Sequence, residues 1–231
     1  MAKHNVWMSV SDLMTGLMVI FLFVTVAYMN MVKDSESILT EYMDLRKDLH
    51  DKLVQEFAGD TTRWKASIGT DLSMKFHDPN GEFEKASFHM NPEFRQKLDE
   101  FIPRYLQILL SSQFRDNIKE IRIEGHTDPE PAPQIHPDPF IANTMLSQLR
   151  TVEVLHYIRC MPTYRAYSED DRRLLEYLFT ANGLSYSKAL DHKGEYAFKS
   201  HAPIDEDKSR RVEFRIITRG DEVFEEFIKK K

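Results

Sequence analysis

The stretch Ile-Arg-Ile-Glu-Gly-His-Thr-Asp at residues 121–128 decides how the soluble part of this chain folds. Apolar and charged side chains alternate over its first half, which predicts a β-strand, and the glycine and polar residues that follow predict a loop. A helix is expected next, from about Asn143 to Arg159. Its apolar residues recur on one side, at Leu146, Leu149, Val152, Leu155 and Ile158.

Neighbouring segments extend this pattern. Alternation at 72–76 and 211–217 predicts two more strands, and residues 78–81, Asp-Pro-Asn-Gly, predict a turn. A helix is expected to open at Asn91-Pro92. Its apolar residues recur every four positions, at Phe94, Leu98, Ile102 and Leu106. Another helix is expected at about 170–182. The order strand, helix, strand, helix, strand indicates an α/β sandwich over residues 70–231.

The composition limits the classes of function. The chain has 231 residues and a formal net charge of −6, without a cluster of Lys and Arg beyond Lys229–Lys231, so nucleic acid is not expected as a partner. Cys160 is the single cysteine, which excludes an internal disulfide and a thiolate metal cage. No nucleophile elbow or phosphate-binding glycine loop is present, so neither an enzyme activity nor a cofactor is expected.

One group of side chains invites comparison with a metal site. Imidazole and carboxylate groups that suit divalent ions occur at His126, Asp128, Glu130, His136 and Asp138. The prolines between them are expected to hold these side chains apart. No metal site is therefore predicted.

The N-terminal region predicts one transmembrane helix. From Leu13 to Val32 no Asp, Glu, Lys or Arg occurs, and about 20 residues of helix match the roughly 30 Å hydrocarbon core of a bilayer. A cleavable signal peptide is the alternative, but its apolar stretch is shorter and ends in a small-residue site that is missing here. Residues 1–33 are therefore expected to be an uncleaved anchor of the bacterial inner membrane, with a cytoplasmic N-terminus and the large remainder periplasmic.

Asp12 directly precedes this apolar segment. It could mark the water boundary, as a carboxylate in the first helical turn with Ser11 as the cap. Alternatively Trp7 lies in the headgroup layer, which puts Asp12 about 7 Å deeper, inside the membrane. Intramembrane acids usually face a partner helix or a water path and carry ions. Thr15, one turn further on, could hold a water molecule or the passing ion.

The stretch Ser-Asp-Leu-Met-Thr-Gly-Leu-Met at residues 11–18 resembles the membrane helix of the MotB-type stator subunits of ion-driven motors. In that family an aspartate near the cytoplasmic end of the single span carries the ion, and two such helices stand inside a ring of MotA-like membrane subunits. The resemblance implies that Asp12 takes up and releases a proton, with sodium as the alternative, and that a second copy of the chain is a partner.

Residues 34–69 are expected to form a helical linker. Apolar residues recur at spacings of three and four, at Ile38, Tyr42, Leu45, Leu49 and Leu53. Two copies could pair along this stripe as a short coiled coil. Equally, the stripe could pack on its own domain, since it covers only about two to three heptads.

Three blocks of the soluble part resemble the OmpA-like peptidoglycan-binding domain: residues 124–128, Glu-Gly-His-Thr-Asp; residues 143–150, Asn-Thr-Met-Leu-Ser-Gln-Leu-Arg; and residues 209–213, Ser-Arg-Arg-Val-Glu. The family's G-H-T-D, N-x-x-L-S-x-x-R and R-R-V patterns correspond to them. The match covers roughly residues 70–218 and implies that the chain binds the stem peptide of the bacterial wall.

In that family the Asp of the first block and the Arg of the second hold diaminopimelate, so the resemblance implies these roles for Asp128 and Arg150, with Thr127 and Asn143 beside them. An aspartate opposite an arginine would match the ammonium and carboxylate of a free amino acid end. Asp128 and Arg150 could instead form a structural ion pair. The proline-rich, acidic loop that starts at Pro129 is longer than the family's and puts ligand access in question.

The segment 162–187 extends the usual domain, and together with residues 209–215 it is most similar to the ZorB subunits of the Zorya antiphage defence systems. That resemblance implies ZorA-like ring subunits as partners and a role in antiviral defence. The alternatives are a flagellar-type stator subunit and a static peptidoglycan tether without ion transport.

Overall fold

The computed structural model describes residues 2–77, 82–84 and 87–221, with the backbone alone at 2–9, 34–36, 38 and 39. The predicted turn at 78–81 and the basic cluster at 229–231 lie outside these residues. The chain divides into two compact units, residues 1–44 and 45–231. The helix α1, Ala2–Phe57, runs through the first unit and contributes its last turns to the second.

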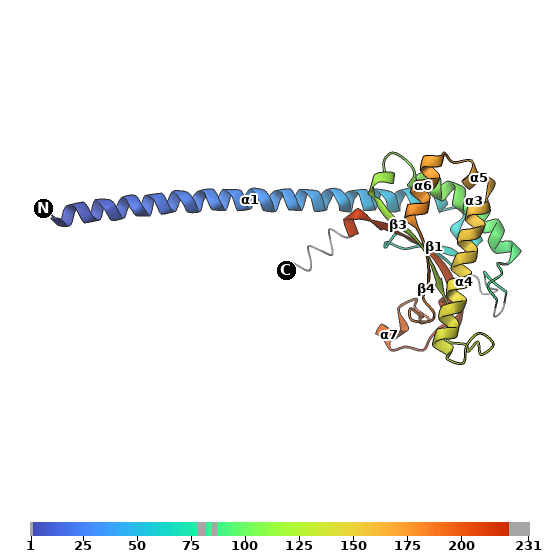
Figure 1. Ribbon diagram of the computed structural model, residues 1–231. Coiled ribbons are helices and arrows are strands. Elements are labelled where there is room, and N and C mark those ends of the chain that lie inside the picture. Colours follow the sequence, from blue (N-terminus) through green and yellow to red (C-terminus); the bar gives the residue numbers. More distant parts are fainter. Residues whose placement is uncertain (1, 78–81, 85–86, 222–231) are drawn as a thin grey trace. The chain divides into compact units, whose positions relative to one another are not determined.

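The second unit is built on a five-stranded mixed sheet of order β1-β2-β5-β3-β4. Its strands are β1 (Ala66–Ile68), β2 (Ser73–Phe76), β3 (Ile118–His126), β4 (Phe179–Gly183) and β5 (Arg211–Thr218). Figure 1 labels β1, β3 and β4 of this sheet. Among the strands of the described residues, only β3 and β4 pair in parallel. The predicted strands at 72–76, 121–124 and 211–217 are confirmed as β2, β3 and β5, and the predicted α/β sandwich is confirmed with them.

Three longer helices belong to this unit: α3 (Pro92–Leu109), α4 (Pro139–Cys160) and α6 (Glu169–Leu178). Short elements connect them: α2 (Thr61–Trp64), η1 (Arg115–Asn117), α5 (Pro162–Arg165), α7 (Ala197–Ser200) and α8 (Glu206–Ser209). The predicted opening at Asn91-Pro92 is confirmed. α4 begins earlier than expected, because the Asp138 carboxylate accepts hydrogen bonds from the backbone amides of Phe140 and Ile141 and caps the helix there.

Strand alternation gives the sheet one apolar and one charged face. On the apolar face, Phe214 of β5 packs against Phe101 and Tyr105 of α3, at ring-centroid distances of 5.2 and 6.1 Å. α4 lies so close to β3 that a Cβ atom on Gly125 would lie 2.7 Å from the Ser147 carbonyl oxygen. The opposite face carries the charged side chains of β3 and β5.

Two expectations about helices are wrong. The helix predicted at 170–182 ends at Leu178, and Phe179–Gly183 forms strand β4. The predicted apolar side of α4 is also only partly buried, since Leu149 and Val152 are 43% and 48% exposed. Small polar residues, Ser147 and Thr151, face the sheet instead, because the close approach of helix and strand leaves no room for larger side chains.

The stripe predicted for the linker packs on its own domain where it enters the second unit. Leu49, Leu53 and Phe57 are almost fully buried in the core. The Phe57 ring lies 5.2 Å from the Phe101 ring of α3. These last turns of α1 are therefore part of the globular fold, and Leu49 and Leu53 are not available for pairing with a second copy.

Candidate functional site

The residues at the ends of β3 and β5 lie together because the two strands pair antiparallel, with His126 opposite Arg211. Asp128 follows the end of β3, and Arg210 precedes the start of β5. Arg150 comes from α4. Three separate parts of the sequence thus supply the charges of the candidate site.

Asp128 is nearly buried, with 5% of its surface exposed. Its Oδ1 accepts a hydrogen bond of 2.9 Å from the backbone amide of Glu130, and its Oδ2 accepts one of 2.6 Å from Nη1 of Arg210. The alternative of a structural ion pair between Asp128 and Arg150 is therefore wrong, because the partner of Asp128 is Arg210.

Arg150 is held by contacts with Ser87 and Phe83. Its Nε donates to the Ser87 carbonyl oxygen at 2.9 Å, and its guanidinium lies 4.9 Å from the centre of the Phe83 ring. Burial lowers the pKa of Arg150 to about 10, although Glu82 and Asp128 oppose this shift. The group stays charged at neutral pH. Among the described residues, no hydrogen bond involves its two terminal nitrogens.

Thr127 and Asn143 are both 2% exposed and support the site from within. The Asn143 side-chain amide donates to the carbonyl oxygens of Glu130 and Pro139, at 3.0 and 3.1 Å, and so ties both ends of the proline-rich loop to α4. The Thr127 backbone amide donates to the Ser185 carbonyl oxygen at 3.0 Å. In this arrangement Asn143 positions the loop that carries Asp128.

Arg210 was not predicted as a member of the site, although the quoted block 209–213 contains it. The available signal was the doublet Arg210-Arg211 at the start of a strand, since consecutive strand residues point to opposite faces. Arg211 is indeed turned into the domain, where it is 2% exposed, while Arg210 reaches Asp128.

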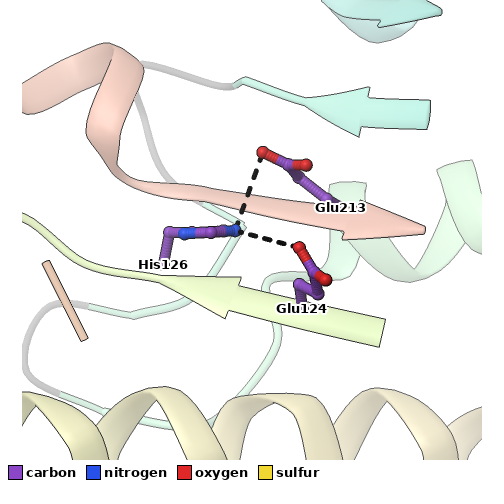
Figure 2. Close-up of side chains that lie close together, drawn as sticks. All are labelled: Glu124, His126 and Glu213. Carbon is purple, nitrogen blue, oxygen red and sulfur yellow. Dashed lines mark ion pairs between the residues drawn. The ribbon is translucent and has the colours of Figure 1, made fainter. Parts of the chain in front are cut away.

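Below the site, on the charged face of the sheet, lies a buried cluster of Glu124, His126 and Glu213 (Figure 2). Nε2 of His126 is 3.8 Å from Glu124 and 3.6 Å from Glu213, too far for a hydrogen bond. Within the described part of the chain, neither ring nitrogen of His126 has a hydrogen-bond partner. Burial lowers the pKa of His126, so the ring is neutral at pH 7.

Two arginines on β5 balance the two glutamates of this cluster. Nε of Arg211 lies 2.6 Å from Glu213, and Nη2 of Arg215 lies 3.1 Å from the other oxygen of Glu213. Burial alone would raise the pKa of Glu213, but Arg211 and its other neighbours lower it to about 2. A divalent ion would add two uncompensated positive charges here, so the cluster is explained by the ion pairs rather than by a metal.

The other predicted residues, Asp12 and Thr15, lie on α1. The segment Val10–Lys33 is long and apolar enough to cross a membrane. Because α1 begins at Ala2, Asp12 lies inside the helix, and the alternative in which Ser11 caps its start is wrong. The Asp12 and Thr15 side chains are exposed, and the Thr15 hydroxyl donates to the Ser11 carbonyl oxygen at 2.8 Å.

Comparison with known proteins shows the family. No protein-family model matches the chain. A Zorya protein ZorB of Escherichia coli strain Crooks is 33% identical over 222 residues, which cover 93% of this chain and 88% of that protein. A second Zorya protein ZorB, from another Escherichia coli strain, is 26% identical over 227 residues, covering 93% of this chain and 81% of its own length.

Among solved structures, the periplasmic domain of Helicobacter pylori MotB is similar at 17% identity and a TM-score of 0.42, covering 70% of this chain and 93% of that one. A second structure of that domain gives 19% identity and a TM-score of 0.40 over 67% of this chain and 81% of that one. The assignment rests on the sequence relatives, which match almost from end to end: this chain belongs to the ZorB family of Zorya proteins.

Proposed function

We propose that this chain is the membrane-anchored stator subunit of an ion-driven rotary motor in Zorya antiphage defence. Asp12 carries the ion, a proton in the first instance, and the second unit binds peptidoglycan. Two copies stand within a ring of ZorA-like membrane subunits, the counterpart of MotA. The N-terminus is cytoplasmic, and the second unit lies in the periplasm. Membership of the ZorB family supports the Zorya partners.

The carboxylate of Asp12 is the observation that carries the proposal. It is exposed on a helix whose following residues, Leu13 to Val32, include no Asp, Glu, Lys or Arg. A charge at such a position costs several kcal/mol in lipid unless it faces protein or water. A static tether would gain nothing from a carboxylate at this position, whereas a subunit that accepts and releases cations needs such a group. Thr15, three residues on, lies on the same helical face.

The charges at the ends of β3 and β5 support wall binding. Diaminopimelate in a stem peptide offers an ammonium and a carboxylate on one carbon atom. Asp128 can accept from the ammonium, and the guanidinium of Arg150 can bind the carboxylate with its two terminal nitrogens. Thr127 and Asn143 hold the segments that carry these groups.

The ion-carrying role is tested by Asp12→Asn, which keeps the size of the side chain and removes its charge. Cells with the complete Zorya system are expected to lose phage protection, and vesicles with the chain and its ring subunits are expected to lose ion flux. Asp44→Asn is the matched control, since Asp44 is exposed on the same helix outside the apolar segment. If Asp12→Asn keeps protection and flux, the chain is a tether and not a motor subunit.

Wall binding is tested by sedimentation of the full chain, in detergent, with purified sacculi. Arg150→Ala is expected to remove binding, because no other described guanidinium occupies its place beside Phe83. Arg173→Ala is the control, since the Arg173 side chain is 71% exposed in a helical ion pair. Sedimentation of Arg150→Ala at the wild-type level would refute the wall site.

A further inference from the structure

Asp128, the acidic residue of the candidate wall site, already forms an ion pair with Arg210 of the same chain. Nη1 of Arg210 lies 2.6 Å from Oδ2 of Asp128, where the ammonium of a ligand is expected to bind. A second nitrogen of Arg210 bonds to Asp207. A ligand must therefore compete with Arg210 for Asp128.

The pair is shielded from water on one side. The Asp128 side chain is 8% exposed, and that of Arg210 is 31% exposed. Partial burial alone would lower the pKa of Arg210, but the hydrogen bond with Asp128 raises it. Separating the two charges without a new cation for Asp128 leaves a nearly buried carboxylate uncompensated, which is strongly unfavourable.

A ligand with one charge can replace only one partner. An amine could pair with Asp128 but would leave Arg210 with Asp207 as its remaining acidic partner, and a carboxylate could pair with Arg210 but would leave Asp128 alone. An ammonium and a carboxylate on the same carbon atom replace both partners at once. The terminal nitrogens of Arg150 remain for the second carboxylate oxygen.

We propose that Arg210 is a specificity-determining residue of the wall site: it closes Asp128 to singly charged groups and exchanges partners only with a free amino acid end. This rests on the proposed wall binding. The site then rejects a stem peptide whose diaminopimelate amine is acylated in a cross-link, and one whose carboxylate is amidated, because each has lost one of the two charges.

Three small molecules of matched length test this inference. meso-Diaminopimelate carries both charges at each end, cadaverine keeps only the amines, and pimelate keeps only the carboxylates. Binding to the full chain in detergent is measured by calorimetry. Wild type is expected to prefer diaminopimelate over each of the others by about 100-fold or more. In Arg210→Gln, cadaverine is expected to bind about tenfold more tightly, because Asp128 is open, so the discrimination falls at least tenfold.

Asp207→Asn is the control, because it removes the other partner of Arg210 and leaves the pair with Asp128 in place. An unchanged ratio of diaminopimelate to cadaverine affinity in folded Arg210→Gln overturns the inference, and so does weaker cadaverine binding. If that variant does not fold, Arg210→Lys replaces it. Lysine lacks the planar guanidinium, so the ratio of diaminopimelate to cadaverine affinity must fall at least about threefold. The proposed function fails separately, when wild type binds neither diaminopimelate nor sacculi.

Discussion

Glu213→Gln is expected to destabilise the second unit severely, because it removes one negative charge from the buried cluster beneath the site. The Glu213 side chain is 1% exposed and contacts Arg211 at 2.6 Å and Arg215 at 3.1 Å. Glutamine fills the same space but leaves Arg211, itself 2% exposed, without its anion. Removing one partner of a buried ion pair typically costs about 3–5 kcal/mol.

The pKa of Glu213 gives an independent magnitude. Its fall from 4.5 to about 2 in the folded state corresponds to roughly 3 kcal/mol, at about 1.4 kcal/mol per pH unit. Because the folded pKa is the lower one, this stabilisation is complete above the unfolded value of 4.5. It is lost as the pH falls toward 2, where the folded carboxylate takes up a proton.

The assay is denaturant unfolding of the full chain in detergent, followed by the fluorescence of Trp64, which is 2% exposed in the fold. The free energy of unfolding of wild type should exceed that of Glu213→Gln by about 3 kcal/mol at pH 7, and this difference should shrink between pH 4.5 and 2. Glu169→Gln, in an exposed helical pair, should cost less than about 0.5 kcal/mol. If the free energy of unfolding of Glu213→Gln is less than about 1 kcal/mol below that of wild type at pH 7, Glu213 is not needed to balance the charges of Arg211 and Arg215.

Three further predictions concern stability and use the same unfolding assay. Gly183→Ala should cost about 1–3 kcal/mol, because the new Cβ would lie 2.3 Å from the backbone nitrogen of Gln148; an unchanged midpoint would show that α4 can move away. Leu53→Ala should cost about 2–5 kcal/mol, while Met43→Ala, at a side chain 58% exposed, should cost under about 0.5 kcal/mol; equal effects would place the last turns of α1 outside the fold. Burial lowers the pKa of His77 to about 4, so stability should fall as the pH drops from 6.5 to 4, and less steeply in His77→Asn; parallel pH profiles would exclude His77 as a cause.

The strands at the centre of the sheet could be predicted because apolar and charged residues alternate along them. β4 could not, since Phe179–Gly183 follows α6 directly, without a glycine or proline to mark the change. The buried side of α4 was also mispredicted. Periodicity counts apolar residues, whereas Ser147 faces the sheet because Gly125 allows the two backbones to approach closely.

For the candidate site, the sequence predicted Asp128 and Arg150 but not Arg210, which is the arginine that pairs with the aspartate. That pairing depends on the antiparallel register of β3 and β5, which places Arg211 opposite His126. Register is a property of the folded sheet and cannot be read from one strand alone. The buried cluster of Glu124, His126 and Glu213 was not predicted either. Its residues lie on two strands that are far apart in the sequence, and only the register brings them together.

In the sheet, β5 lies between β2 and β3, and β3 lies between β5 and β4. A wall fragment bound at Asp128 and Arg210, which adjoin β3 and β5, would therefore pull on two inner strands. Each of these strands is hydrogen-bonded along both sides. An outer strand can be peeled away one bond at a time, whereas an inner one resists traction with several bonds at once. Mechanical load would therefore enter the sheet at its strongest part.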